Sequence, residues 1–113
     1  MGVLDQLQSG GQALVPAFWA LEVLNSLLVG ERKGRIAPEQ TATFLNALKI
    51  LNPALDYVTL VQVVGSVQII CRDYRLTPYD ALYIELAQRL CCPLATLDQA
   101  QRDAATALGV HCL

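Results

Sequence analysis

Short apolar runs alternate with longer helical stretches along this chain, and that alternation limits its possible folds more than any other feature. The runs are 13–15, 56–58, 94–97 and 110–113. A helix between two strands returns the chain to the same edge of a sheet, so that the two strands are parallel. The pattern therefore predicts an α/β domain with a mainly parallel sheet that helices cover on both faces.

Capping and turn residues set the bounds of the predicted helices. Thr77 is placed as an N-cap with Pro78 at the first helical position, and Pro16 suits the same first position of an earlier helix. Residues 3–9 are interpreted as the end of a helix that two consecutive glycines stop. The predicted helices are 17–33, 38–51, 59–74, 78–90 and 99–108.

Composition excludes several classes of protein. With 113 residues, of which 54% are hydrophobic and 16% charged, the chain has enough apolar side chains for a single domain over 1–113, and it is not disordered. The apolar stretch 13–24 is shorter than the roughly 20 residues of a membrane-spanning helix. The N-terminus lacks the features of a signal peptide, so we expect a cytoplasmic location. The net charge of -2 restricts any nucleic-acid contact to a local patch.

Three carboxylates are predicted to meet at one edge of the sheet. Asp98 directly follows the 94–97 run, Asp80 lies in the first turn of a predicted helix, and Glu22 lies in the helix after the 13–15 run. The carboxyl ends of parallel strands and the first turns of the following helices share an edge, where ligands bind. Like charges gathered in a cleft require compensation. A divalent cation such as Mg²⁺ supplies it and can promote displacement at phosphorus.

Two of these acids also have a structural interpretation, whereas Glu22 stands among apolar residues and needs a partner if it is ionised. Asp80 fits a capping box with Thr77, and Asp98 fits the N-cap of the last helix. Thr96 faces the same side of its strand as Asp98 and could hold a metal-bound water or a phosphate, or it could be an ordinary β-branched strand residue. Asn25 extends the polar stripe that begins at Glu22 along an otherwise apolar helix, as expected for the lining of a pocket.

Three segments resemble the acidic motifs of PIN domains. Val15-Pro16-Ala17-Phe18-Trp19-Ala20-Leu21-Glu22-Val23-Leu24-Asn25 is similar to the second motif of that family. Arg75-Leu76-Thr77-Pro78-Tyr79-Asp80-Ala81-Leu82-Tyr83 is similar to the third, and Pro93-Leu94-Ala95-Thr96-Leu97-Asp98 to the fourth. Their order and spacing also fit. The strongest resemblance is to VapC-type ribonuclease toxins of bacterial toxin–antitoxin pairs.

This resemblance implies a fold, an activity and partners. The fold is a three-layer α/β/α sandwich, and the activity is endonucleolytic cleavage of single-stranded RNA with Mg²⁺ or Mn²⁺. By motif, Glu22, Asp80 and Asp98 are expected to be the catalytic metal ligands, Thr96 a supporting polar group and Asn25 an outer candidate. A cognate antitoxin and a homodimer are the expected protein partners, and either would cover apolar surface in a chain whose 54% of hydrophobic residues is above the usual share of about 45–50%.

One departure from the family pattern opens an alternative function. Family members begin with a strand that ends in a catalytic Asp, and we expect this strand-and-helix unit to be truncated here. Asp5 superficially resembles the missing acid. However, only ten residues separate it from Pro16, which is too few for the helix and second strand that usually follow that acid in the family. The alternative is therefore a catalytically impaired binding module that dimerises or captures an antitoxin. A phosphatase or another small-molecule hydrolase that uses the same acids is a further possibility.

Overall fold

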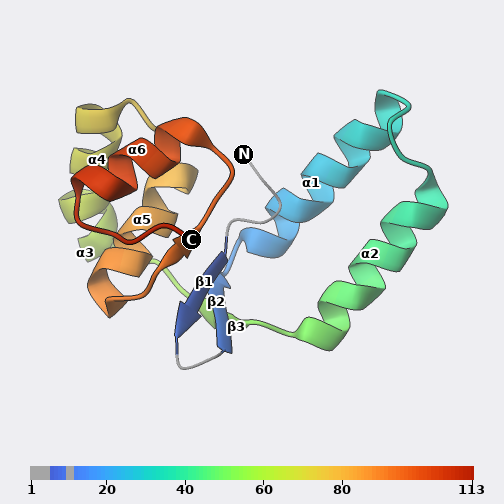
Figure 1. The fold of residues 1–113 in the computed structure, drawn as a ribbon, viewed down its shortest axis with the longest axis horizontal. Coiled ribbons are helices and arrows are strands. Elements are labelled where there is room, and N and C mark those ends of the chain that lie inside the picture. Colours follow the sequence, from blue (N-terminus) through green and yellow to red (C-terminus); the bar gives the residue numbers. More distant parts are fainter. Residues whose placement is uncertain (1–5, 10–11) are drawn as a thin grey trace. The chain divides into compact units, whose positions relative to one another are not determined.

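The computed structural model describes residues 6–9 and 12–113 (Figure 1). These residues form two compact units. The first, called here the sheet unit, combines Met1–Ala17 with Ala54–Leu113, and the second, the helical unit, is Phe18–Pro53. The helical unit consists of α1 (Trp19–Arg32) and α2 (Pro38–Leu51), and the sheet unit contains the remaining elements. The strands of the sheet unit are β1 (Gln6–Ser9), β2 (Gln12–Pro16), β3 (Ala54–Asp56) and β4 (Leu94–Ala95).

The four strands form one sheet in the order β3-β2-β1-β4. β2 and β3 are parallel, with Val15 opposite Leu55. β1 runs antiparallel to both of its neighbours, with Leu7 opposite Leu14 of β2 and opposite Leu94 of β4. The α/β class predicted from the sequence is confirmed. The sheet is mixed rather than mainly parallel, because β1 returns to β2 through a short connection that cannot hold a crossover helix.

β1 corrects the interpretation of residues 3–9 as a helix end. The spacing of Leu4 and Leu7 suggested a helix, but Gln6-Leu7-Gln8 alternates polar and apolar residues as a strand does. In the sheet order, β1 lies at an inner position between β2 and β4. Residues 1–5 and the glycines at 10 and 11 lie outside the described residues, and so does the suggested substitute acid Asp5.

Other predicted elements agree with the structure to different degrees. The strand at 13–15 and the helices at 38–51, 78–90 and 99–108 are confirmed within one or two residues, although Pro16 ends β2 and does not begin α1. The predicted strand at 56–58 is shifted to β3, and 110–113 contributes only an isolated parallel bridge between Leu94 and Cys112. The predicted 59–74 helix consists of α3 (Leu60–Gln62), a π-helical segment (Val63–Val67) and α4 (Gln68–Tyr74). Its interruption is at Gly65, whose ψ of -112 is not helical.

The core of the sheet unit surrounds α5 (Pro78–Leu90). Its residues Ala81 to Ala87 are all buried, including the carboxylate-bearing Glu85. This helix contacts the sheet strands β1, β2 and β4, the π-helical segment, α4 and α6 (Gln99–Ala107). The strand residues Val15 and Leu94 are fully buried. The sheet unit therefore has a continuous core of its own, which fixes the first turns of α5 and α6.

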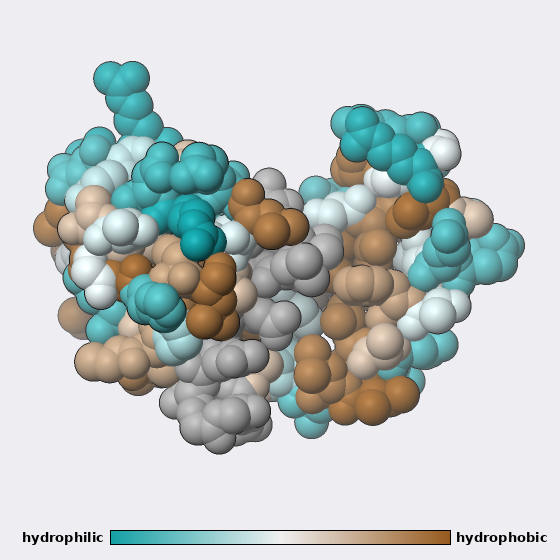
Figure 2. All heavy atoms as spheres, viewed as in Figure 1, coloured by the Kyte–Doolittle hydropathy of each residue, from teal (hydrophilic) through white to brown (hydrophobic). Residues whose placement is uncertain are grey.

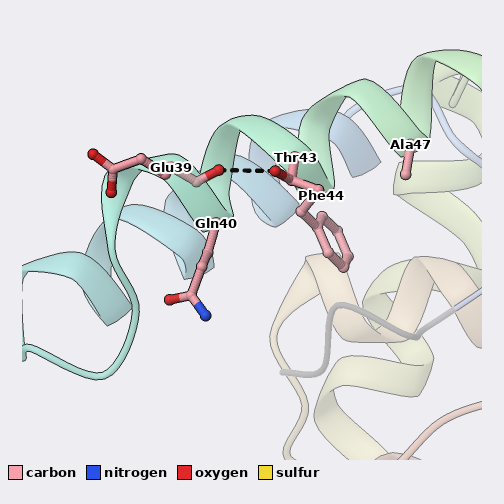
Figure 3. A pocket seen from close by; sticks show the side chains of 5 residues that line it. All are labelled: Glu39, Gln40, Thr43, Phe44 and Ala47. Atoms are coloured by element: carbon pink, nitrogen blue, oxygen red, sulfur yellow. Dashed lines mark hydrogen bonds between the residues drawn. The ribbon is translucent and has the colours of Figure 1, made fainter.

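The helical unit has fewer buried residues. α1 contacts α2, and the buried residues of this unit are Trp19, Val23 and Thr41. A hollow of about 400 Å³ lies along one face of α2 (Figure 3), where the Thr43 hydroxyl donates a hydrogen bond to the Glu39 carbonyl oxygen at 3.0 Å. All the residues that line the hollow belong to α2, and Glu39 is the only acid among them. The hollow therefore lacks the pair of carboxylates expected of the metal site. Over the part of the chain that is described, no helix is long and apolar enough to span a bilayer.

Candidate metal and catalytic site

Asp80 is placed by the start of α5. Thr77 is the N-cap of this helix, as predicted, and its hydroxyl accepts a hydrogen bond from the Asp80 backbone N–H at 3.2 Å. Pro78 follows at the first helical position, where its missing N–H costs nothing. Asp80 is thus the third residue of the helix, and the helix dipole favours a negative charge there.

The Asp80 carboxylate is electrostatically strained. Its Oδ1 atom is buried and accepts no hydrogen bond from any residue that the structure describes. Burial, followed by the negative charge of Asp98, raises the pKa of Asp80 above its usual value. An unpaired, buried carboxylate oxygen beside a second acid is an arrangement that a bound cation relieves. The donor set therefore fits a hard divalent ion, which prefers carboxylate oxygens.

Asp98 is placed by the start of α6. As the N-cap of that helix, its Oδ1 accepts a hydrogen bond from the Gln101 backbone N–H at 2.8 Å, and its carbonyl oxygen accepts one from the Arg102 N–H at 2.9 Å. The N-cap interpretation from the sequence is confirmed. Capping uses one carboxylate oxygen, so this role and metal binding through the other oxygen are compatible.

Thr96 is part of a buried hydrogen-bond network. The side chain of this residue is only 5% exposed. Its hydroxyl donates to Gln101 Oε1 at 2.6 Å and accepts from the Asp98 N–H at 3.0 Å. Two of the hydrogen bonds available to the hydroxyl are therefore made within the protein. Thr96 shapes the chain just before Asp98, whatever else it binds.

Gln101 is the residue that the sequence interpretation missed. It is fully buried, and its Nε2 donates a hydrogen bond to the Asp80 backbone carbonyl oxygen at 3.0 Å. The sequence did contain a signal. Gln three residues after an Asp N-cap is the pattern of a capping box, in which the Gln side chain bonds back to the N-cap N–H. Here Thr96 accepts from that N–H instead, which leaves the Gln101 side chain available to reach α5.

Glu22 and Asn25 belong to the other unit. Glu22 lies in the first turn of α1 and is half-buried, and Asn25 is exposed one turn further on. The structure thus brings Asp80, Asp98 and Thr96 together in the sheet unit, and it holds Glu22 and Asn25 in the helical unit. Within the described ranges, no group of three or more His, Cys, Asp or Glu side chains could hold a metal ion. The convergence of all three acids stays a prediction.

The sheet unit thus places one acid at the N-cap of α6 and another in the first turn of α5, with α5 and α6 in contact. The PIN domain model matches residues 2–107 and so spans both units. The chain belongs to the PIN domain family, whose members are nuclease-like and metal-dependent. No curated protein matches the chain.

Proposed function

We propose that this protein is a metal-dependent endonuclease of single-stranded RNA, with Asp80, Asp98 and Glu22 as the ligands of Mg²⁺ or Mn²⁺. The observation that carries the proposal is the buried Oδ1 of Asp80, which has no hydrogen-bond donor among the described residues and lies near a second acid. Membership of the PIN domain family supports RNA as the substrate.

The residues of the chain divide the work. A divalent ion, when bound, supplies a water of lowered pKa and charge neutralisation at the scissile phosphate. Asp80 offers a carboxylate whose pKa is raised by burial and by the charge of Asp98, so a bound cation would favour its ionised form. Asp98 is held by its capping bond to Gln101, which orients its second oxygen. The ordered first turn of α5 places N-terminal helix charge beside the acids, where an anionic substrate is favoured.

Cleavage of a labelled single-stranded RNA pool tests the proposal directly. We expect cleavage with Mn²⁺ or Mg²⁺, none with EDTA, and a loss of roughly 100-fold or more in Asp80→Asn, as expected for an outright metal ligand. Asp103→Asn is the matched control, because Asp103 is an exposed acid of α6 outside the proposed site. Cleavage that persists in Asp80→Asn, or that Asp103→Asn reduces equally, would overturn the assignment of the site.

We further infer that the chain acts as the toxin of a VapBC-type pair, with an antitoxin and a second copy of itself as protein partners. Support comes from an apolar strip on the segment between β3 and the π-helical segment, in which Tyr57, Leu60 and Val61 are 72%, 76% and 81% exposed. Figure 2 shows further apolar residues at the surface of the helical unit. Contiguous exposed apolar residues typically mark an interface.

Two polar side chains at the ends of this strip, Asp56 of β3 and Gln62 of α3, are bonded to α5. Gln62 Nε2 donates to Glu85 Oε1 at 3.0 Å, and Asp56 Oδ2 accepts from the Arg89 guanidinium at 2.7 Å. Leu60→Glu should therefore reduce self-association, measured by light scattering, and capture of the antitoxin encoded beside this gene. Lys49→Glu on α2 is the control for the added charge. If Leu60→Glu changes neither interaction, the strip is not the partner surface.

A second candidate function is a catalytically impaired PIN-like module that binds a partner without cleaving RNA. It is favoured by the lack, among residues 6–9 and 12–113, of a group of three acids able to hold a metal ion. This function predicts antitoxin capture by wild-type protein that shows no RNA cleavage with either ion. Asp5→Asn separates the two: a loss of cleavage in that variant would mean that Asp5 serves as an acid of a working nuclease site.

A further inference from the structure

We propose that Gln101 is a positioning residue that holds Asp80 and Asp98 at a fixed spacing for a shared divalent cation. The inference rests on the proposed function, since it concerns the same acids. It is independent of Glu22, because every residue it uses belongs to the sheet unit. Gln101 does not touch a reacting group, and its role is to fix those that do.

The geometry forms a closed set of hydrogen bonds around one side chain. Gln101 accepts from the Thr96 hydroxyl through Oε1 at 2.6 Å, and it donates to the Asp80 carbonyl oxygen through Nε2 at 3.0 Å. Its backbone N–H donates to Asp98 Oδ1 at 2.8 Å, and the Asp98 N–H donates to the Thr96 hydroxyl at 3.0 Å. One residue therefore connects the end of the β4 segment, the start of α6 and the start of α5.

The burial of this side chain makes its contacts obligatory. Gln101 has 0% exposure, so water cannot replace a lost partner of its amide. An amide of fixed length that must satisfy both Thr96 and the Asp80 carbonyl oxygen sets the separation of α5 and α6 at their first turns. Leucine would fill much of the same space without setting that separation by hydrogen bonds. The two hydrogen bonds from Gln101, to Thr96 and to the Asp80 carbonyl oxygen, explain why an amide side chain occupies a fully buried position.

The link matters for a metal because the two acids repel each other in its absence. Asp80 and Asp98 lie at the first turns of two helices that contact each other, and like charges placed there favour separation of the two helix starts. Gln101 opposes that separation. Replacement of a residue that orients a metal ligand typically lowers the affinity for the metal by roughly 10- to 100-fold.

The test compares Gln101→Met with Gln99→Met. The first change removes both side-chain hydrogen bonds and keeps the backbone cap to Asp98. The second alters the same residue type two positions earlier on α6, where the Gln99 side chain is exposed and bonds only to Asp103 among the described contacts. Mn²⁺ binding is measured by electron paramagnetic resonance of the free ion, at a temperature where circular dichroism shows each variant folded. Val67→Ala, a truncation of a buried side chain elsewhere in the sheet unit, is the control for loss of stability alone.

We expect Gln101→Met to raise the Mn²⁺ dissociation constant by roughly 10-fold or more, and cleavage to recover as Mn²⁺ is increased. Gln99→Met and Val67→Ala should leave the constant unchanged, although Val67→Ala lowers the melting temperature. If wild type binds Mn²⁺ and cleaves RNA while Gln101→Met binds the ion equally well, the positioning role is wrong and the proposed function stands. If wild type neither binds Mn²⁺ nor cleaves RNA, the proposed function fails and this inference fails with it.

If the Gln101→Met variant does not fold, a second measurement on the wild-type protein tests the same inference. In wild-type protein titrated with Mg²⁺, the side-chain amide resonances of Gln101 should shift with the same midpoint as the carboxyl carbons of Asp80 and Asp98. Those of Gln99 should not shift. Gln101 resonances that stay fixed while the two carboxyl signals move would overturn the inference.

Discussion

The first turns of α5 and α6 are built from similar parts in opposite positions. In α5 a threonine is the N-cap and an acid, Asp80, is the third helical residue. In α6 an acid, Asp98, is the N-cap and an amide, Gln101, is the third helical residue. The acid at the N-cap is held by a hydrogen bond through one oxygen, whereas the acid at the third position keeps a buried oxygen without a donor among the described residues.

This difference shows how two ordinary helix caps can produce one polarised site. A capping acid satisfies its own charge locally and gains about 1 kcal/mol for the helix. The acid of α5 does not cap, because Thr77 already does so, and its charge therefore remains available. The site thus contains one carboxylate that a capping hydrogen bond orients, and one whose buried Oδ1 has no hydrogen-bond partner among the described residues.

The largest expected effect is stabilisation by a cation. At a free Mn²⁺ concentration of 100 times its dissociation constant, an ion that binds only the folded state raises the free energy of unfolding by about 2.7 kcal/mol. We expect most of this increase to disappear in Asp80→Asn, measured by thermal denaturation with Mn²⁺ and with EDTA. Asp103→Asn should retain it. Equal stabilisation of wild type and Asp80→Asn would show that Mn²⁺ binds elsewhere.

The next effect separates the buried Thr96 hydroxyl, which holds the start of α6, from the exposed Thr77 N-cap of α5. Thr96→Val removes a hydroxyl that serves two buried hydrogen bonds, and we expect a loss of about 2 kcal/mol in the free energy of unfolding. Thr77→Ala removes a solvent-exposed N-cap and should cost about 1 kcal/mol. Urea denaturation measures both. The comparison between the two threonines fails if the Thr77 variant is the less stable protein.

A smaller effect distinguishes the two roles of Asp98. Asp98→Ala removes the cap and should lower the free energy of unfolding by about 1 kcal/mol, whereas Asn still accepts the hydrogen bond from Gln101 and should be nearly neutral. Both variants should bind Mn²⁺ more weakly, because both lack the charge. Denaturation and Mn²⁺ titration of the pair provide the test. Normal Mn²⁺ binding by Asp98→Asn would leave Asp98 with the capping role alone.

The sequence predicted these helix starts well because capping is local. Thr77 and Asp98 are N-caps as expected, and the side chains that identify them lie within three residues of the groups they bind. The strand at 13–15 and the long α2 helix were also predictable from apolar patterns and proline position. Local chemistry determines these features, so one sequence is enough to find them.

The features that the sequence did not predict depend on long-range contacts. β1 pairs with β4 across almost ninety residues of sequence, and no local pattern indicates that partner. The hydrogen bond from Gln101 to the Asp80 carbonyl oxygen joins two residues that are 21 positions apart in the sequence. Its geometry follows from the packing of α5 against α6.

The smallest expected effect is a pH dependence that originates at Asp80. Its folded-state pKa is raised above the unfolded value of about 3.9, so the folded protein binds the proton more readily. Stability from this group must then fall as pH rises from about 4 through the raised pKa, and the loss is complete above it. Solvent around the partly exposed carboxylate reduces the magnitude. Asp80→Asn is neutral at every pH and should therefore gain stability relative to wild type as pH rises.

Urea midpoints of the two proteins in metal-free buffer, followed from pH 4 to 7, measure this difference because the other acids titrate in both. The order of causes can be tested as well. Burial contributes more than the Asp98 charge to the raised pKa, so Asp98→Asn should reduce the pH-dependent difference at Asp80 without removing it. Complete removal by Asp98→Asn would show that repulsion dominates. A wild type that gains stability relative to Asp80→Asn as pH rises would mean that the Asp80 carboxylate has a stabilising partner, and the contrast between the two helix starts would not hold.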